Sequence, residues 1–186
     1  MELDHAIETR HSCRRFSTKK VNWEDIIECV DSANKAPQAG NIPVVRFVIV
    51  DNPEKIQKLA DAAQQDFISN ASYAVVVCSN PTQLKRSYDQ RGEMYSRQQS
   101  GAAIENFLLK LTELGLATCW VGAFADEMVR HALSIPEEVL VEAILPVGYE
   151  MPPKSKQRQK ADLDEVLYFN KWKEKRMKPL KMPEAR

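Results

Sequence analysis

The sequence lacks the features that mark several large classes of protein. Its 186 residues contain no apolar run long enough to cross a bilayer, so a membrane-spanning chain is excluded. Lysine and arginine number 26, as do aspartate and glutamate, and the formal net charge is therefore zero. A protein that neutralises many phosphates normally carries a basic excess, so nucleic acid is not an expected partner. A chain of this length with 44% hydrophobic residues can still bury a core of its own.

Short cysteine motifs and a secretory signal are also missing. No two cysteines form a CxxC pair, which excludes a zinc knuckle and a thioredoxin-type redox motif. The first residues lack the basic and apolar regions of a signal peptide. The three histidines are scattered along the chain and do not indicate a metal site. We therefore expect a cytoplasmic protein with reduced thiols and no metal.

Several catalytic motifs do not occur either. Without GxGxxG or a Walker lysine motif, neither a Rossmann dinucleotide fold nor a phosphate-loop NTPase is expected. No GxSxG surrounds a serine, and the one-residue gap between His11 and Cys13 does not make a Cys–His pair. Hydrolysis is therefore a poor match to this sequence.

Hydrophobic periodicity predicts helices and strands in alternation. Helices are expected at about 3–9, 23–36, 53–63, 102–114 and 126–133, and strands at about 47–50, 74–78, 118–121 and 141–147. Asn22 can cap the helix at 23–36, and Asp126 can cap the helix that runs to Leu133. This order favours an α+β or α/β domain of three layers. The helix at 102–114 is the most apolar, which indicates either a contact with a partner subunit or a central core helix. After residue 170, charge and proline argue against an independent packed unit.

Three stretches carry groups that suit an anion or a planar ligand. Residues 10–15 read Arg-His-Ser-Cys-Arg-Arg, and their converging donors match a phosphate, with a solvated basic turn as the alternative. Gly40 and Asn41 precede a strand, where the backbone can approach a ligand closely. Gly122 and Ala123 follow a buried strand and can expose backbone N–H groups.

Four motifs occur together in one chain. They are Arg-His-Ser-x-Arg near the N-terminus, Ala-Pro-x-Ala-Gly-Asn before the first strand, Gly-Leu-Ala-Thr-Cys-Trp-Val-Gly-Ala-Phe in the middle, and Leu-Pro-Val-Gly-Tyr near the end. In this order, over about residues 3–172, they resemble the nitroreductase-like family of FMN-dependent oxidoreductases. The resemblance implies an α+β, three-layer fold in which helices flank a central, mainly antiparallel sheet. It also implies a homodimer with FMN at two sites in the subunit interface.

The resemblance assigns parts of the chain and individual residues. Residues 1–170 match a single FMN-binding domain, and residues 171–186 match a C-terminal arm that packs on the partner subunit or is partly disordered. Arg10, His11 and Ser12 match residues that hold the FMN phosphate and ribityl chain. Arg14 matches the residue beside the flavin pyrimidine edge, where a cation stabilises the reduced ring.

Further positions complete the implied FMN site. Asn41 and Pro43 match a loop that approaches the flavin from the partner subunit, and Gln65 matches an amide at its polar edge. The backbone of Gly122 and Ala123 matches the strand end near N5 and O4. In the family, a basic residue after the Gly-Tyr motif usually closes the phosphate site. Here Lys160 aligns best with that residue, and Arg158 is the close competitor.

The implied activity is a two-step exchange on the flavin. NADH or NADPH passes hydride to flavin N5 and leaves, and a small electron-poor acceptor, such as a nitroaromatic or a quinone, then takes its place. No catalytic side chain is required.

The polar segment 88–99 is expected to influence the choice of acceptor. The loop at 41–45 lacks the glutamine and tryptophan usual in the family. There are two alternatives. One is a specialised flavin enzyme, for reductive dehalogenation or flavin breakdown. The other is a flavin-binding module.

Overall fold

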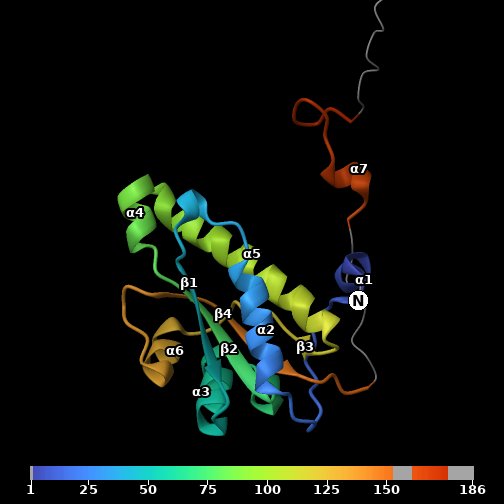
Figure 1. Ribbon diagram of the computed structural model, residues 1–186, viewed down its shortest axis with the longest axis vertical. Helices are drawn as coiled ribbons and strands as arrows, with labels where there is room; N and C mark the ends of the chain where they lie inside the picture. The colour runs from blue at the N-terminus through green and yellow to red at the C-terminus, as the bar shows by residue number, and fades with distance from the viewer. Residues whose placement is uncertain (1, 153–160, 176–186) are drawn as a thin grey trace, which may run out of the picture. The chain divides into compact units, whose positions relative to one another are not determined.

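The fold is built on an antiparallel sheet, seen in a computed structural model that describes residues 2–152 and 161–175 (Figure 1). Its strands are β1 (Val45–Val50), β2 (Tyr73–Ser79), β3 (Ala117–Thr118) and β4 (Leu140–Gly148). They lie in the order β1-β2-β4-β3, and each neighbouring pair is antiparallel. Because β2 and β4 are central and covered on both faces, their sequences are almost continuously apolar. The short strand β3 forms one edge of the sheet.

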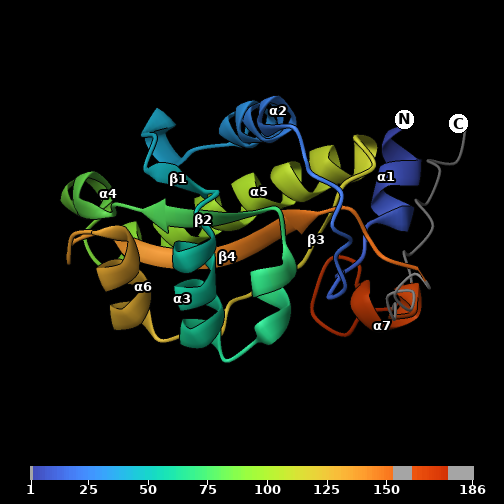
Figure 2. The same cartoon turned by 90° about the horizontal axis from the view of Figure 1, so that it is seen from below.

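Helices cover both faces of the sheet and complete three layers (Figure 2). On one face lie α2 (Trp23–Asn34) and α5 (Arg91–Glu113), and on the other lie α3 (Pro53–Ala63) and α6 (Asp126–Leu133). The remaining helical segments are α1 (Leu3–Thr9), α4 (Thr82–Tyr88), α7 (Leu163–Val166) and the 3₁₀ turns η1 (Ala39–Asn41) and η2 (Asp66–Asn70). The expected α+β, three-layer architecture is confirmed.

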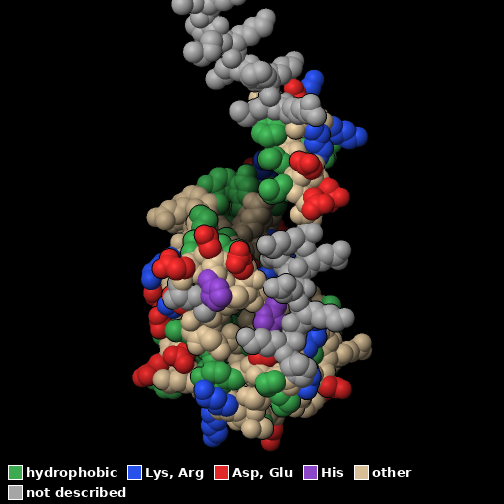
Figure 3. Space-filling view, turned by 90° about the vertical axis from the view of Figure 1, so that its right-hand side faces the viewer, with side chains coloured by type: hydrophobic (Ala, Val, Ile, Leu, Met, Phe, Trp, Pro, Cys, Tyr) green, Lys and Arg blue, Asp and Glu red, His purple; other side chains and the backbone are tan. Residues whose placement is uncertain are grey.

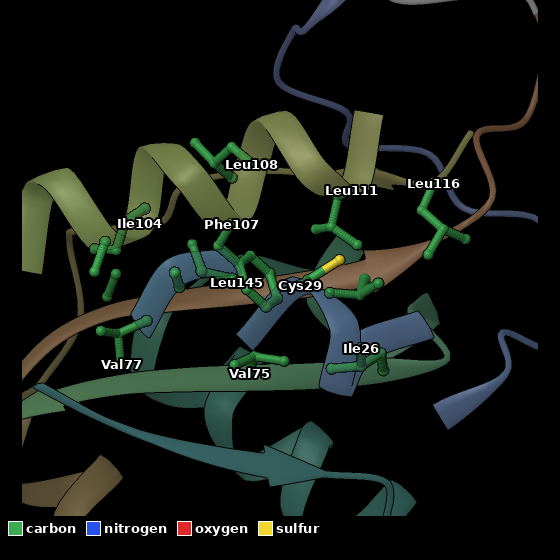
Figure 4. Close-up of a cluster of buried hydrophobic side chains, with 14 of the residues drawn as sticks. Ile26, Cys29, Val75, Val77, Ile104, Phe107, Leu108, Leu111, Leu116 and Leu145 are labelled. Atoms are coloured by element: carbon green, nitrogen blue, oxygen red, sulfur yellow. The ribbon is translucent and has the colours of Figure 1, made fainter. Parts of the chain in front are cut away.

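The core lies in two layers, one on each side of the sheet. Successive side chains of a strand point to opposite faces, so Val75 and Val77 join the α2–α5 layer while Val76 joins the α3–α6 layer. Figure 4 shows side chains of α5, including Phe107 and Leu111, directed toward the sheet. Full burial of a side chain of this size stabilises the fold by about 1.5–3 kcal/mol.

Some helices begin with the cap residue predicted from the sequence, and others do not. Asn22 caps α2, as predicted, because its side chain accepts a hydrogen bond from the Glu24 backbone N–H. Asn52 caps α3 in the same way, and Pro53 occupies the first turn. The prediction that Asp126 caps α6 was wrong, since Asp126 is already helical and Ala125 precedes it.

The predicted start of the long helix at residue 102 was also wrong, because α5 begins at Arg91. The buried face of its first half carries small and polar residues in place of aliphatic ones: Gly92, Ser96, Gln99 and Ser100. Periodicity of apolar residues therefore gives no signal there, although the segment packs as a helix.

Residue contacts divide the chain into two units, Met1–Lys156 and Gln157–Arg186. In the second unit, the rings of Tyr168 and Trp172 lie 4.7 Å apart, and the Phe169 N–H donates to the Glu174 carbonyl. Of the predicted arm, residues 171–175 are described and 176–186 lie outside the described residues. In the ranges that are described, no helix is both long and apolar enough to span a membrane.

Candidate functional site

The basic loop of residues 10–15 lies beside β3 at the edge of the sheet. Ser12 and Thr118 form a parallel bridge, and the Cys13 N–H donates to the Thr118 carbonyl at 2.8 Å. The other end of the loop meets the end of β4, where Phe16 pairs with Glu150. Segments from the N-terminus, the middle and the end of the domain therefore meet at one edge.

The backbone after β3 is held at both ends and exposed between them. Val121 exchanges two hydrogen bonds with Ile144 of β4, at 3.0 and 3.1 Å. Ala125 then donates to the Ala62 carbonyl at the end of α3. Gly122 and Ala123 lie between these anchors and are exposed. The fold thus fixes a short length of exposed backbone that follows β3.

Gln65 belongs to a neighbouring segment that reaches the same edge. Its backbone N–H donates to the Ala60 carbonyl, which fixes its position after α3. Two residues later, the Phe67 ring lies 6.4 Å from the Phe16 ring and 6.0 Å from the Arg14 guanidinium carbon. A guanidinium over an aromatic face is held by a cation–π interaction. Arg14 therefore has a defined place among these segments.

His11 and Arg10 contact acidic partners. The Nε2 atom of His11 lies 3.0 Å from both carboxylate oxygens of Glu150, and its Nδ1 lies 2.8 Å from the Thr9 carbonyl oxygen. The Nε atom of Arg10 lies 3.4 Å from Glu105 of α5. Figure 3 shows histidine and acidic side chains together on the face where α1 lies. These contacts fasten the loop to α5 and to the end of β4.

One buried hydroxyl at this edge lacks a hydrogen-bond partner. Among the described residues, the Thr118 hydroxyl has none, whereas the Arg10 Nε makes no hydrogen bond of good geometry but keeps its ion pair with Glu105. A buried polar group without a partner costs about 1–3 kcal/mol. Because Thr118 pairs with Ser12 of the basic loop, the site is suited to a ligand that offers a hydrogen-bond acceptor.

The cysteines at this edge are not activated. Burial raises the pKa of the Cys119 thiol, and the positive charge of Arg14 with a hydrogen bond from Ser12 acts only partly against it. Burial also raises the pKa of Cys13. Both thiols therefore stay protonated at neutral pH and are poor nucleophiles. In the described part of the chain, no three His, Cys, Asp or Glu side chains are grouped to hold a metal ion.

Asn41 and Pro43 lie elsewhere in the chain. They belong to the loop around η1, which Figures 1 and 2 show at the opposite end of α5 from β3. There the loop contacts Tyr88 and Gln99. In a single chain, Ser12 pairs with Thr118 and Arg14 lies over the Phe67 ring, while Arg10 and His11 belong to the same loop. Gln65 precedes Phe67 by two residues, and Gly122 and Ala123 follow β3 directly after the Val121 bridge. Asn41 and Pro43 are not among these segments. Arg158 and Lys160 lie outside the described residues.

Sequence reasoning missed several residues of this edge. Thr118 and Trp120 lie within a recognised motif, and Trp120 is 42% exposed, with its indole beside Gly122. Glu150 directly follows the Gly-Tyr motif. Their neighbourhood in the sequence could have indicated all three. Nothing in the sequence indicated Phe67.

Comparisons with known proteins match most of the chain. A family model described as the nitroreductase family matches residues 7–80 and 61–149. A protein of Archaeoglobus fulgidus, provisionally named an NADH dehydrogenase/NAD(P)H nitroreductase, is 35% identical over 80% of this chain and 85% of its own length. The iodotyrosine deiodinase of Thermotoga neapolitana is 27% identical over 79% of this chain and 88% of its own. The solved structure of an FMN-dependent nitroreductase from Clostridium difficile superposes with a TM-score of 0.75 and 25% identity, covering 90% of this chain and 98% of that one.

Proposed function

The chain belongs to the nitroreductase family, and we propose that it is an FMN-dependent oxidoreductase that takes reducing equivalents from NADH or NADPH. The observation that carries this proposal is the contact between the basic loop and β3, in which Ser12 pairs with Thr118 and Arg14 lies close enough to Cys119 to affect its thiol. The exposed backbone of Gly122 and Ala123 follows on the same segment of the chain. Relatives whose names include FMN or NAD(P)H support the choice of cofactor and donor.

The donor set at this edge fits FMN. A phosphate dianion needs several N–H and O–H donors, and Arg10, Ser12 and the unsatisfied Thr118 hydroxyl supply them. Lys160 or Arg158 would close the phosphate site. His11, whose ring nitrogens contact Glu150 and Thr9, would act by holding the loop in place. Arg14, the Gln65 amide and the N–H groups of Gly122 and Ala123 would face the polar edge of the ring.

Bound FMN supplies a hydride acceptor at N5 and returns the electrons to a second substrate. The chain itself contributes orientation and electrostatics. Arg14 would place a positive charge near the ring edge that gains negative charge on reduction, and the backbone N–H groups of Gly122 and Ala123 would stabilise the same charge. The protonated thiols of Cys13 and Cys119 take no part in this exchange.

We propose that the protein acts as a homodimer. The η1 loop, which carries Asn41 and Pro43, lies at the opposite end of α5 from β3, and the basic loop that carries Arg14 pairs with β3 (Figures 1 and 2). An FMN that contacts both loops would therefore require two chains. A cytoplasmic location is consistent with four cysteines that are all free thiols.

The acceptor is proposed to be a small, planar, electron-poor molecule such as a nitroaromatic or a quinone. The likeness to an iodotyrosine deiodinase supports one alternative, reductive removal of halide from an aromatic ring. Product analysis with a nitroaromatic and with a halogenated tyrosine separates the two activities. A module that binds flavin without turnover would convert neither.

An absorbance spectrum tests the proposal. The purified protein is supplied with FMN, desalted, and recorded under anaerobic conditions before and after addition of NADH or NADPH. We expect retained flavin that bleaches with at least one nucleotide and recovers when an acceptor is added. Flavin that stays oxidised would leave only a binding role, and loss of flavin on desalting would contradict FMN binding.

A further inference from the structure

The loop that carries Asn41 and Pro43 adopts a backbone conformation that needs support. Gly40 and Asn41 are consecutive residues in the left-handed region, with φ values of 58° and 56°. A non-glycine residue rarely adopts this conformation, which asparagine tolerates best. Within the turn, Asn41 donates to the Gln38 carbonyl and Ile42 to the Ala39 carbonyl, at 3.2 and 3.1 Å. These two bonds alone are a weak constraint on an exposed turn.

Gln99 of α5 supplies two further hydrogen bonds from beneath the turn. Its side chain is 5% exposed. With the amide oriented to suit its neighbours, the nitrogen donates to the Ile42 carbonyl at 3.2 Å and the oxygen accepts from the Ala39 N–H at 2.9 Å. Ala39 and Ile42 flank the two left-handed residues, so one side chain ties both sides of the turn to a rigid helix.

Tyr88 holds the outer side of the same turn. A β-carbon at Gly40 would lie 2.5 Å from the Tyr88 hydroxyl oxygen, which shows how closely the ring covers this residue. The Tyr88 ring in turn packs edge-on against Tyr95 of α5, with centroids 5.2 Å apart. Both contacts come from the polar segment 88–99.

We propose that Gln99 is a positioning residue of the FMN site, which presents Asn41 and Pro43 to the cofactor through its two bonds to the turn. The inference rests on the proposed function, because the two loop residues are proposed FMN contacts. A buried amide on a helix is otherwise unexplained, since an aliphatic residue would pack there at lower desolvation cost. Segment 88–99 thus acts on the cofactor through the loop that it holds.

The test uses Gln99→Leu and Gln99→Glu in the full chain, with FMN affinity measured by fluorescence quenching after the native cofactor is removed. Leucine removes both bonds, and we expect FMN to bind about tenfold more weakly. A glutamate at this position accepts from Ala39 but donates to Ile42 only when protonated. We therefore expect Gln99→Glu to bind FMN weakly at pH 8 and close to normally near pH 5.5.

Charged groups around the turn are few. The residues that line the space beside Gln99 are uncharged: Ala33, Asn34, Ala36, Pro37, Gln38, Val45, Phe47 and Ala103. Among the described residues, Arg46 donates to the Pro43 carbonyl and the Tyr88 hydroxyl lies against Gly40. The unchanged protein carries both groups as well, so recovery at low pH that only Gln99→Glu shows reports the introduced carboxyl.

Gln83→Leu and Gln83→Glu are the matched controls, because Gln83 is exposed on α4. Their FMN affinity should follow that of the unchanged protein at every pH. If Gln99→Leu lowers the melting temperature but binds FMN normally, or if Gln99→Glu shows no recovery at low pH, the positioning role is refuted. If the unchanged protein fails to bind FMN, the proposed function itself is refuted instead.

Discussion

At the scale of single residues, Arg14 is the side chain whose charge matters most for the proposed chemistry. Its guanidinium is placed by the Phe67 ring and lies close enough to Cys119 to affect that thiol. We expect Arg14→Ala to slow reduction by NADH or NADPH by about tenfold or more, because the reduced ring loses a stabilising cation. Arg14→Lys, which keeps the charge, should lose less. Stopped-flow absorbance measures both rates, and an alanine variant with normal rate and FMN affinity would remove Arg14 from the mechanism.

Thr118 offers a substitution whose effects on stability and on binding should have opposite signs. Valine has the shape of threonine without the hydroxyl, which is buried and unpartnered among the described residues. Thr118→Val should leave the melting temperature of the FMN-free protein unchanged or higher, because no hydrogen bond is lost. FMN should bind about tenfold more weakly if the hydroxyl is one of its donors. Thr112→Val is the control, since that hydroxyl already donates to the Leu108 carbonyl.

The buried thiols of Cys29 and Cys78 should make the free energy of unfolding fall at alkaline pH. Burial raises the pKa of Cys78 from 9.0 to about 11 and that of Cys29 to about 12. As the pH rises, these thiols lose their protons at lower pH in the unfolded chain than in the folded chain. Their contribution to the free energy of unfolding is therefore complete below about pH 9 and is lost as the pH rises toward 11 and 12. Each thiol should lower the free energy of unfolding by about 1 kcal/mol per pH unit in that window.

Urea unfolding between pH 7 and 10.5 measures this effect. The double variant Cys29→Ala/Cys78→Ala should be less stable overall, because methylene-sized cavities remain, but its stability should fall less steeply above pH 9. Lysine and tyrosine groups are the same in both proteins, so the difference in slope isolates the thiols. Parallel curves for the two proteins would contradict the assignment.

At the scale of elements, two glycines of α5 should respond in opposite ways to the same change. A β-carbon at Gly92 would collide with the Lys85 backbone nitrogen, so alanine there would push α4 and α5 apart. We expect Gly92→Ala to destabilise the fold by about 1–3 kcal/mol. Among the described residues outside the helix's own backbone, the nearest atom to such a carbon at Gly101 belongs to Trp120 and lies 4.0 Å away. Alanine there should be neutral or stabilise the helix by up to about 1 kcal/mol. Thermal unfolding compares the two, and equal effects would show that α4 does not constrain α5.

Some elements could be predicted from the sequence and others could not. The apolar runs of β2 and β4, and the cap at Asn22, were predicted because burial and capping leave direct local signals. The first half of α5 was not, because its buried face uses Ser96, Gln99 and Ser100, whose role appears only when the turn at Ala39 and the sheet are in place. Part of the proposed site could be located from motifs, since Arg14 and Gly122 lie within them. Phe67 could not, because only the folded chain places its ring against the guanidinium.

At the scale of the whole molecule, the separation of Asn41 from Arg14 predicts how subunits should complement one another. If each FMN site takes Arg14 from one chain and Asn41 from the other, a mixed dimer of Arg14→Ala and Asn41→Ala carries one intact site and one doubly changed site. Mixing and refolding the two weak variants should therefore restore part of the activity of the unchanged protein. Sedimentation should show a dimer throughout. A monomer, or a mixture no more active than its components, would contradict a shared site.

The joining of distant segments at the edge of the sheet has a consequence for biosynthesis. His11 and Glu150 are 139 residues apart in the chain, yet they contact each other directly beside the β3 bridge. Contacts of such long sequence separation form late, because they close large loops. During synthesis, the basic loop therefore cannot contact Glu150 until almost the entire domain has left the ribosome. In hydrogen exchange, amides of residues 10–17 should be protected only in the completed domain, so cofactor capture follows chain completion.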